Sequence, residues 1–155
     1  MKIAIGNDHV GLELKEDIVN FLEEHQIENH DFGTNKKDRT DYPLFAEKVA
    51  VAVVNKGFDL GILICGTGIG MSIAANKIEG VRAAACSDSY SARLARNHNN
   101  ANILCLGALV VGKGLALLLV EEWIKAQYEG GRHQRRIDLI KELEVKNSIN
   151  RPMTS

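Results

Sequence analysis

Four short apolar runs stand out along the chain, at residues 3–5, 60–65, 81–86 and 103–106. They are too short to form independent helices, and most of their residues do not alternate with polar ones. Runs of this kind are typical of strands that are buried on both faces of a sheet. The pattern therefore predicts four buried strands, and a weaker candidate for a fifth lies at residues 27–32.

The segments between these runs have the spacing of amphipathic helices. Apolar side chains share one helical face in two of them, namely Leu14, Ile18, Phe21 and Leu22 in one and Leu115, Leu119 and Trp123 in the other. Further helices are expected over residues 41–56, 87–97 and 134–145. Strands that alternate with helices predict an α/β fold, in which a parallel sheet is covered on both sides.

Composition adds the size of the domain and its setting. We expect one domain over residues 1–146 and a polar, disordered tail over residues 147–155. A net charge of −1, with acids and bases mixed, predicts no broad nucleic-acid surface. The apolar patch at the N-terminus has three residues, which is too short for a signal-peptide core or a membrane span. The three scattered cysteines fit neither a disulfide framework nor a CxxC site, which favours a reducing cytoplasm.

The predicted sheet brings several polar segments to one edge. In open α/β sheets, ligands bind at the carboxyl ends of the strands. Four segments follow directly after the apolar runs, at residues 7–9, 65–70, 87–88 and 107–109. We therefore expect a ligand site along this edge.

One of these segments contains the alternating glycines Gly66-Thr67-Gly68-Ile69-Gly70. Their GxGxG spacing differs from the dinucleotide fingerprint GxGxxG, although Asp88 lies where a ribose-binding acid could sit. No Lys-Ser/Thr pair follows, so the segment is not a Walker loop. Glycines let backbone N–H groups approach an anion. On the glycines alone, an anion cradle, a nucleotide loop and a tight turn without a ligand all stay open.

Cys65 ends the strand before this loop. Cys86 and Cys105 are interpreted as small buried apolar residues, which is the usual role of a free cysteine. A thiol at a helix N-terminus can instead have its pKa lowered from about 8.5 toward neutrality. Cys65 is therefore a candidate nucleophile or general base.

Two histidines lie in polar stretches at the ends of predicted elements. His98 falls at the end of a predicted helix, and His9 follows the first strand, next to Asp8. His98 could instead be a surface or capping residue, and Asp8 could cap the next helix. Both stretches are candidates for acid–base or binding roles.

Arg132 and Arg136 are four residues apart and therefore share one helical face. Two guanidinium groups on one face suit a phosphate dianion. The alternative is a solvated basic turn paired with Glu129 or Asp138.

Taken in order, the segments GNDHVG, RTDYP, CGTGIGMSIAANK, GVRAA, HNNAN and YEGGRHQRR resemble one family. It is the group of sugar-phosphate isomerases that includes ribose-5-phosphate isomerase B and galactose-6-phosphate isomerase, and the ribose-5-phosphate branch is the more similar. The resemblance covers residues 1–143 and implies a Rossmann-like three-layer fold with a five-stranded parallel sheet. It also implies interconversion of ribose 5-phosphate and ribulose 5-phosphate without a metal or nucleotide, in a homodimer or tetramer with sites at the subunit interface.

The resemblance also implies roles for individual residues. Cys65 matches the base that moves a proton between C1 and C2, and His98 matches the acid that opens the furanose ring. Thr67 and Asp8 complete the implied catalytic set. The implied substrate contacts are Asp8, His9, Tyr42, Gly66, Thr67, Gly68, Ile69, Gly70 and Asn99, with Arg132 and Arg136 as phosphate ligands. Isomerisation through an ene-diolate needs these parts: a base, donors for the oxyanion, an acid for the ring and a phosphate anchor.

Two positions depart from residues that the family often shows. Some members carry a glutamate base where this chain has Met71, which leaves Cys65 as the base. Many carry an arginine where this chain has Leu109, which keeps the hexose phosphates allose 6-phosphate and galactose 6-phosphate open as substrates. A non-catalytic module that binds a sugar phosphate or a nucleotide is the third possibility.

Overall fold

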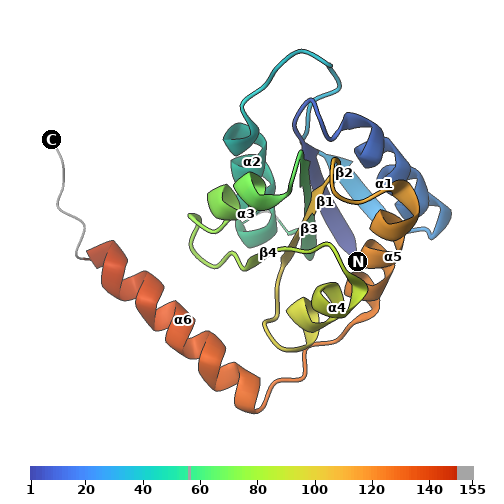
Figure 1. The fold of residues 1–155 in the computed structure, drawn as a ribbon. Coiled ribbons are helices and arrows are strands. Elements are labelled where there is room, and N and C mark those ends of the chain that lie inside the picture. Colours follow the sequence, from blue (N-terminus) through green and yellow to red (C-terminus); the bar gives the residue numbers. More distant parts are fainter. Residues whose placement is uncertain (56, 150–155) are drawn as a thin grey trace, which may run out of the picture.

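The computed structural model describes residues 1–55 and 57–149, which form a parallel sheet between two layers of helices (Figure 1). Five strands make up the sheet, in the order β2-β1-β3-β5-β4, and every neighbouring pair is parallel. Their bounds are β1 Lys2–Asn7, β2 Glu28–Asp31, β3 Leu60–Cys65, β4 Ala83–Ala85 and β5 Ile103–Gly107. The predicted three-layer α/β fold is confirmed.

The strand predictions are most accurate at the centre of the sheet. The central strand β3 coincides with the predicted run and is buried throughout. The edge strand β4 is shorter than the predicted 81–86, because only Ala83–Ala85 pair with β5. The other edge strand, β2, is mostly exposed and has the sequence ENHD, which explains why its apolar signal is weak.

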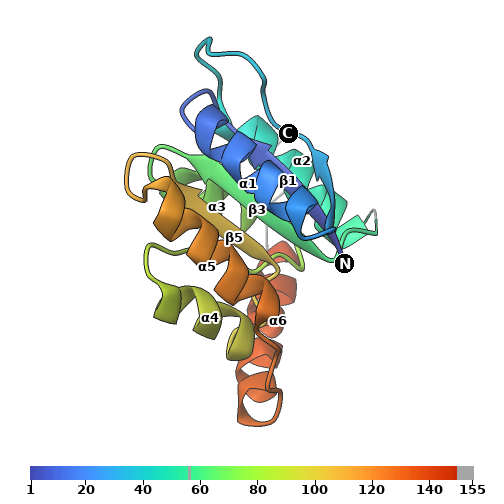
Figure 2. The ribbon, with the colours of Figure 1, turned by 90° about the vertical axis from the view of Figure 1, so that its right-hand side faces the viewer.

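Two helical layers bury the faces of the sheet. Their bounds are α1 Leu12–Glu24, α2 Tyr42–Asn55, α3 Ile69–Ala75, α4 Ser89–Asn97, α5 Lys113–Lys125 and α6 Arg132–Ile149. Helices α2 and α3 cover one face, where Val49 and Met71 pack on Leu63. Helices α1, α4 and α5 cover the other face, where Ile18 and Trp123 belong to the core (Figures 1 and 2).

Helix α4 returns the chain from the carboxyl ends of the strands to their amino ends. It begins after the carboxyl end of β4 and ends five residues before the amino end of β5, alongside α5 (Figure 2). The five residues of β5 span about 13–17 Å at the rise of an extended strand. Residues at the end of α4 therefore lie at the amino ends of the strands, whereas residues that follow β1 and β3 lie at the carboxyl ends.

Helix α6 projects from the body of the molecule (Figure 1). His133 in its first turn is buried, whereas Leu139, Ile140, Leu143 and Val145 are exposed. The helix begins two residues before the predicted 134–145 and continues to Ile149, three residues into the predicted tail. The rest of that tail lies outside the described residues.

None of the helices in the described part of the chain combines the length and apolar character needed to cross a membrane.

Candidate active site

Cys65 lies at the carboxyl end of the central strand, directly before α3. Its side chain is 5% exposed, and its Sγ accepts a hydrogen bond from the Gly68 backbone N–H at 3.2 Å. Gly68 is the N-cap of α3. A backbone N–H and a helix N-terminus both stabilise a thiolate more than a neutral thiol. The geometry thus suits the predicted role of Cys65 as a base.

The three glycines of the loop have different surroundings. A Cβ at Gly68 would lie 3.0 Å from the carbonyl carbon of Leu106, and its φ of +78° is left-handed. A Cβ at Gly70 would lie 2.6 Å from the ring of Tyr42, so this glycine lets α2 pack on α3. A Cβ at Gly66 would meet only Leu109, at 3.5 Å. Gly66 is therefore not demanded by protein contacts, and the space beside it is open.

Leu109 and Thr67 are the neighbours of Gly66 that the structure leaves exposed. The Leu109 backbone N–H donates to the Gly66 carbonyl at 3.0 Å, and the Ala108 N–H donates to the Cys65 carbonyl at 2.8 Å. Leu109 is 78% exposed and forms an apolar wall beside Gly66. Thr67 is also exposed, and its Oγ1 accepts a hydrogen bond from the Ile69 N–H at 3.3 Å.

Asp8 and His9 follow β1, the strand that neighbours β3. The Asp8 Oδ1 accepts hydrogen bonds from the backbone N–H groups of Val10 and Gly11, at 2.9 and 3.1 Å. Part of this carboxylate therefore holds the turn into α1. The His9 Nδ1 accepts from the Thr40 N–H at 3.3 Å, which leaves Nε2 as the nitrogen that carries the proton in the neutral ring.

A buried lysine supports the end of β2 and the segment that follows it, and the sequence does not predict this role. Lys15 is 2% exposed, and its ammonium group donates to the Asp31 carboxylate at 2.7 Å and to the Thr34 carbonyl at 3.1 Å. The Asn7 amide also donates to the Thr34 carbonyl, at 3.1 Å. The one signal in the sequence is the place of Lys15 beside Leu14 on the buried side of α1.

Asp88 and Met71, two further positions considered in the sequence, have structural roles. The Asp88 Oδ1 accepts a hydrogen bond from the Ser91 N–H at 2.7 Å and caps α4, which holds the pKa of Asp88 below its usual value. The position of Asp88 after the glycine loop is thus accounted for by its role as the N-cap of α4. Met71 is fully buried in the core under α3.

A second group of predicted residues lies at the opposite edge of the sheet. His98 is the C-cap of α4, and its ring stacks on that of His133, with centroids 4.1 Å apart and planes 8° apart. The Arg132 Nε lies 3.4 Å from the His133 Nε2. Within the described ranges, neither Arg132 nor Arg136 forms an ion pair, so the paired basic turn is not observed.

Glu129 completes this second group and was considered from the sequence only as a partner for the arginines. Its Oε2 is 3.6 Å from the Nε2 of His98 and from the Nε2 of His133. Burial lowers the pKa of His133, as do the neighbouring charges of His98 and Arg132, whereas Glu129 acts in the opposite direction.

The three side chains His98, Glu129 and His133 offer potential metal ligands within 4.8 Å of one another. A tetrahedral site needs lone pairs that converge on one point. The two imidazole planes are nearly parallel, so their lone pairs do not converge. This cluster suits proton and charge sharing better than metal binding.

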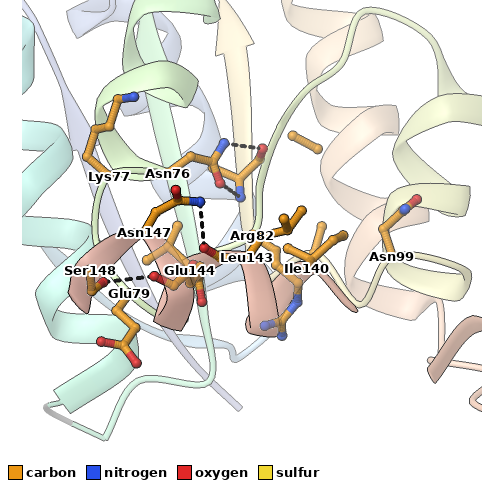
Figure 3. Close-up of a pocket in the computed structure, with 14 residues that line it drawn as sticks. Asn76, Lys77, Glu79, Arg82, Asn99, Ile140, Leu143, Glu144, Asn147 and Ser148 are labelled. Carbon is orange, nitrogen blue, oxygen red and sulfur yellow. Dashed lines mark hydrogen bonds between the residues drawn. The ribbon is translucent and has the colours of Figure 1, made fainter. Parts of the chain in front are cut away.

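A cleft of about 590 Å³ lies between α6 and the side of the domain formed by the edge strand β4 (Figure 3). It does not include Cys65. Ile140 and Leu143 of α6 line one side of it, and Asn76, Arg82 and Asn99 line the other. Asn99, a predicted substrate contact, thus lines this cleft, whereas His98, Glu129 and His133 do not.

Comparison with known proteins relates both groups of residues to one family. The chain matches the family model described as ribose/galactose isomerase over residues 3–140. It is 53% identical over 147 residues to ribose-5-phosphate isomerase B of Escherichia coli (strain K12), covering 95% of this chain and 99% of that relative.

Solved structures agree with the sequence matches. Ribose-5-phosphate isomerase B of Clostridium thermocellum superimposes with a TM-score of 0.94 at 54% identity, covering 95% of this chain and 99% of that one. The Mycoplasma genitalium enzyme with bound ribulose-5-phosphate gives a TM-score of 0.90 at 48% identity, covering 94% and 97%. The resemblance expected from the motifs is confirmed, and the chain belongs to the ribose/galactose isomerase family.

Proposed function

We propose that this chain interconverts ribose 5-phosphate and ribulose 5-phosphate, with Cys65 as the base that moves the proton. The observation that carries the role of Cys65 is its Sγ at the Gly68 N–H, beside the open space at Gly66. The substrate follows from relatives that are named ribose-5-phosphate isomerase B and from the related structure that contains ribulose-5-phosphate.

The chemistry can be followed atom by atom. The Cys65 thiolate removes the proton from C2 of the open-chain aldose, and the electron pair moves through the former carbonyl to give an ene-diolate. The hydroxyl proton on O2 passes to O1, and the same carbon-bound proton is returned from Cys65 to C1 as the C2–O bond becomes the carbonyl of the ketose. Backbone N–H groups of the glycine loop stabilise the developing oxyanion, and one such donor is typically worth about 3–4 kcal/mol.

One subunit does not bring together all of the required parts. Cys65 lies at the carboxyl ends of the strands, whereas His98 and Arg132 lie at the amino ends. The two ends are separated by one strand length, about 13–17 Å. A pentose phosphate is shorter than this separation. We therefore expect a homodimer in which one subunit supplies Cys65 and its partner supplies the acid and the phosphate ligands.

Helix α6 supports this arrangement. It exposes Leu139, Ile140 and Leu143, and apolar side chains gathered on one helix are typical of a surface that another chain covers. The cleft in Figure 3 continues this surface between α6 and the β4 edge. A second copy of the chain is the occupant that would also complete the active site.

Two details of the proposal depend on the surroundings of the site. Leu109 forms an apolar wall where a cation would suit a charged substrate, so hexose 6-phosphates are the second candidate substrates. The three free thiols agree with a reducing compartment, and the cytoplasm is the proposed location.

A coupled assay on ribose 5-phosphate, allose 6-phosphate and galactose 6-phosphate tests the proposal. We expect the highest kcat/KM with ribose 5-phosphate, and a loss of about 10²–10⁴-fold in kcat for Cys65→Ala with sugar-phosphate binding retained. If Cys65→Ala kept most of its activity, the assignment of the base would be wrong. A higher kcat/KM with a hexose phosphate would instead correct the substrate.

A further inference from the structure

Two histidines share one carboxylate where α4 ends and α6 begins. The Glu129 Oε2 is 3.6 Å from the Nε2 of His98 and 3.6 Å from the Nε2 of His133. The two rings stack on each other, so each fixes the plane of the other. At this separation, the carboxylate acts on both rings through its charge rather than through a close hydrogen bond.

The two histidines differ in their burial and in the charges around them. His133 is 5% exposed, and burial lowers its pKa, as do the charges of His98, Arg132 and Arg136. His133 is therefore neutral near pH 7. His98 is only half-buried, so of the two rings that face the Glu129 carboxylate it is the one with more surface open to a substrate.

Glu129 is held in place by contacts outside the substrate site. Its backbone N–H donates to the Asn97 carbonyl at 3.0 Å, and the Asn97 side-chain amide donates to the Gln127 carbonyl at 2.6 Å. Gly130 and Gly131, with φ of +66° and +55°, then turn the chain into α6. This segment is thus tied directly to the end of the helix that carries His98.

We propose that Glu129 is a positioning residue, which holds the protonated His98 in the orientation that opens a cyclic aldose phosphate. The inference rests on the proposed function. In the ring-opening step, the ring oxygen takes the proton from His98 as its bond to C1 breaks. The C1 hydroxyl becomes the aldehyde and releases its own proton to water.

The substrate offers a way to separate this step from isomerisation. Ribose 5-phosphate is cyclic and must open, whereas ribulose 5-phosphate cannot close to a furanose, because its 5-oxygen carries the phosphate. Exchange of the C1 hydrogen of ribulose 5-phosphate with D₂O therefore needs the Cys65 base but no ring opening.

The test measures both reactions for the wild-type protein and for Glu129→Gln. We expect turnover of ribose 5-phosphate to fall about 10-fold or more and the C1 exchange of ribulose 5-phosphate to stay within about 3-fold. Glu129→Asp keeps the charge and should recover part of the turnover. Glu121→Gln, which removes a half-buried carboxylate that pairs with Lys125 within α5, is the matched control and should change neither reaction.

An equal loss in both reactions, or no loss in either, would overturn the role of Glu129. Thermal unfolding and the oligomeric state of each variant are measured alongside, so that a folding defect is seen as such. Glu129→Asp then decides the question if Glu129→Gln does not fold. If the wild-type protein catalysed neither reaction, the proposed function would fail first and this inference would fall with it.

Discussion

The three thiols of the chain differ in their surroundings much more than in their exposure. Cys65 and Cys86 are 5% and 7% exposed, but only Cys65 accepts a backbone N–H at the start of a helix. Burial and the nearby Asp88 carboxylate raise the pKa of Cys86 to about 11, and burial also raises the pKa of Cys105. Reactivity should therefore follow the environment of each sulfur.

We predict that iodoacetamide near pH 8 alkylates Cys65 before the other two thiols. Mass spectrometry of the digested protein identifies the modified residue, and ribose 5-phosphate should slow the reaction by covering the site. Modification of Cys86 should become appreciable only as the pH approaches its pKa of about 11. Alkylation of Cys86 ahead of Cys65 would contradict this description of the site.

His133 predicts how stability depends on pH. Its pKa is lower in the folded protein than the usual value of 6.5, so below that pH the unfolded state binds more protons than the folded state. Its contribution to the free energy of unfolding is therefore full above pH 6.5 and is lost as the pH falls. Urea titrations at about pH 7.5 and about pH 5.5 give the free energy of unfolding at each pH. The decrease in this free energy from the higher to the lower pH should be smaller for His133→Gln than for the wild type. If this decrease were the same for the variant and the wild type, a group other than His133 would cause the pH dependence of stability.

At the scale of single residues, the sequence allowed some roles to be predicted but not others. Cys65 could be recognised because a residue that ends a buried strand and precedes a glycine loop has a defined location. Lys15 and Glu129 could not, because their partners, Asp31 and Thr34 for the lysine and His98 and His133 for the glutamate, are brought near only by the fold.

At the scale of elements, the glycine loop provides a matched pair of substitutions. We predict that Gly66→Ala folds normally but loses activity, because its Cβ projects into the space beside Cys65 without touching other atoms closely. Gly68→Ala should instead destabilise the protein by about 1–2 kcal/mol, because its backbone is left-handed and the added Cβ meets the backbone of β5.

Denaturant unfolding and kcat/KM, measured for both variants, separate the two effects. A Gly66→Ala variant with full activity would mean that the substrate does not approach this part of the loop. Wild-type stability in Gly68→Ala would show that the loop tolerates a side chain at its left-handed position.

The elements themselves were predicted well where burial dictates the sequence. A strand buried on both faces, such as β3, must be apolar throughout, and its bounds were read directly from the pattern. The edge strand β2 and helix α6 are less constrained, because much of their surface is exposed in one subunit. The helix predicted over residues 134–145 accordingly starts two residues later than α6 and ends before the observed end of α6 at Ile149.

At the scale of the whole molecule, the sequence predicts a ligand site at the carboxyl ends of the strands but does not show that the candidate residues divide between the two ends of the sheet. The division follows from the direction of α4, which carries His98 back to the amino edge. The proposed homodimer would therefore combine Cys65 of one subunit with His98 of the other in each site.

Heterodimers test this combination most directly. Cys65→Ala and His98→Asn chains with different tags are co-expressed, and dimers that contain one chain of each kind are isolated by both tags. One of their two sites then carries both substitutions and the other carries neither, so we predict about half of the wild-type activity on ribose 5-phosphate, whereas each homodimer is nearly inactive. Heterodimers as inactive as the two homodimers would contradict a site built from two subunits.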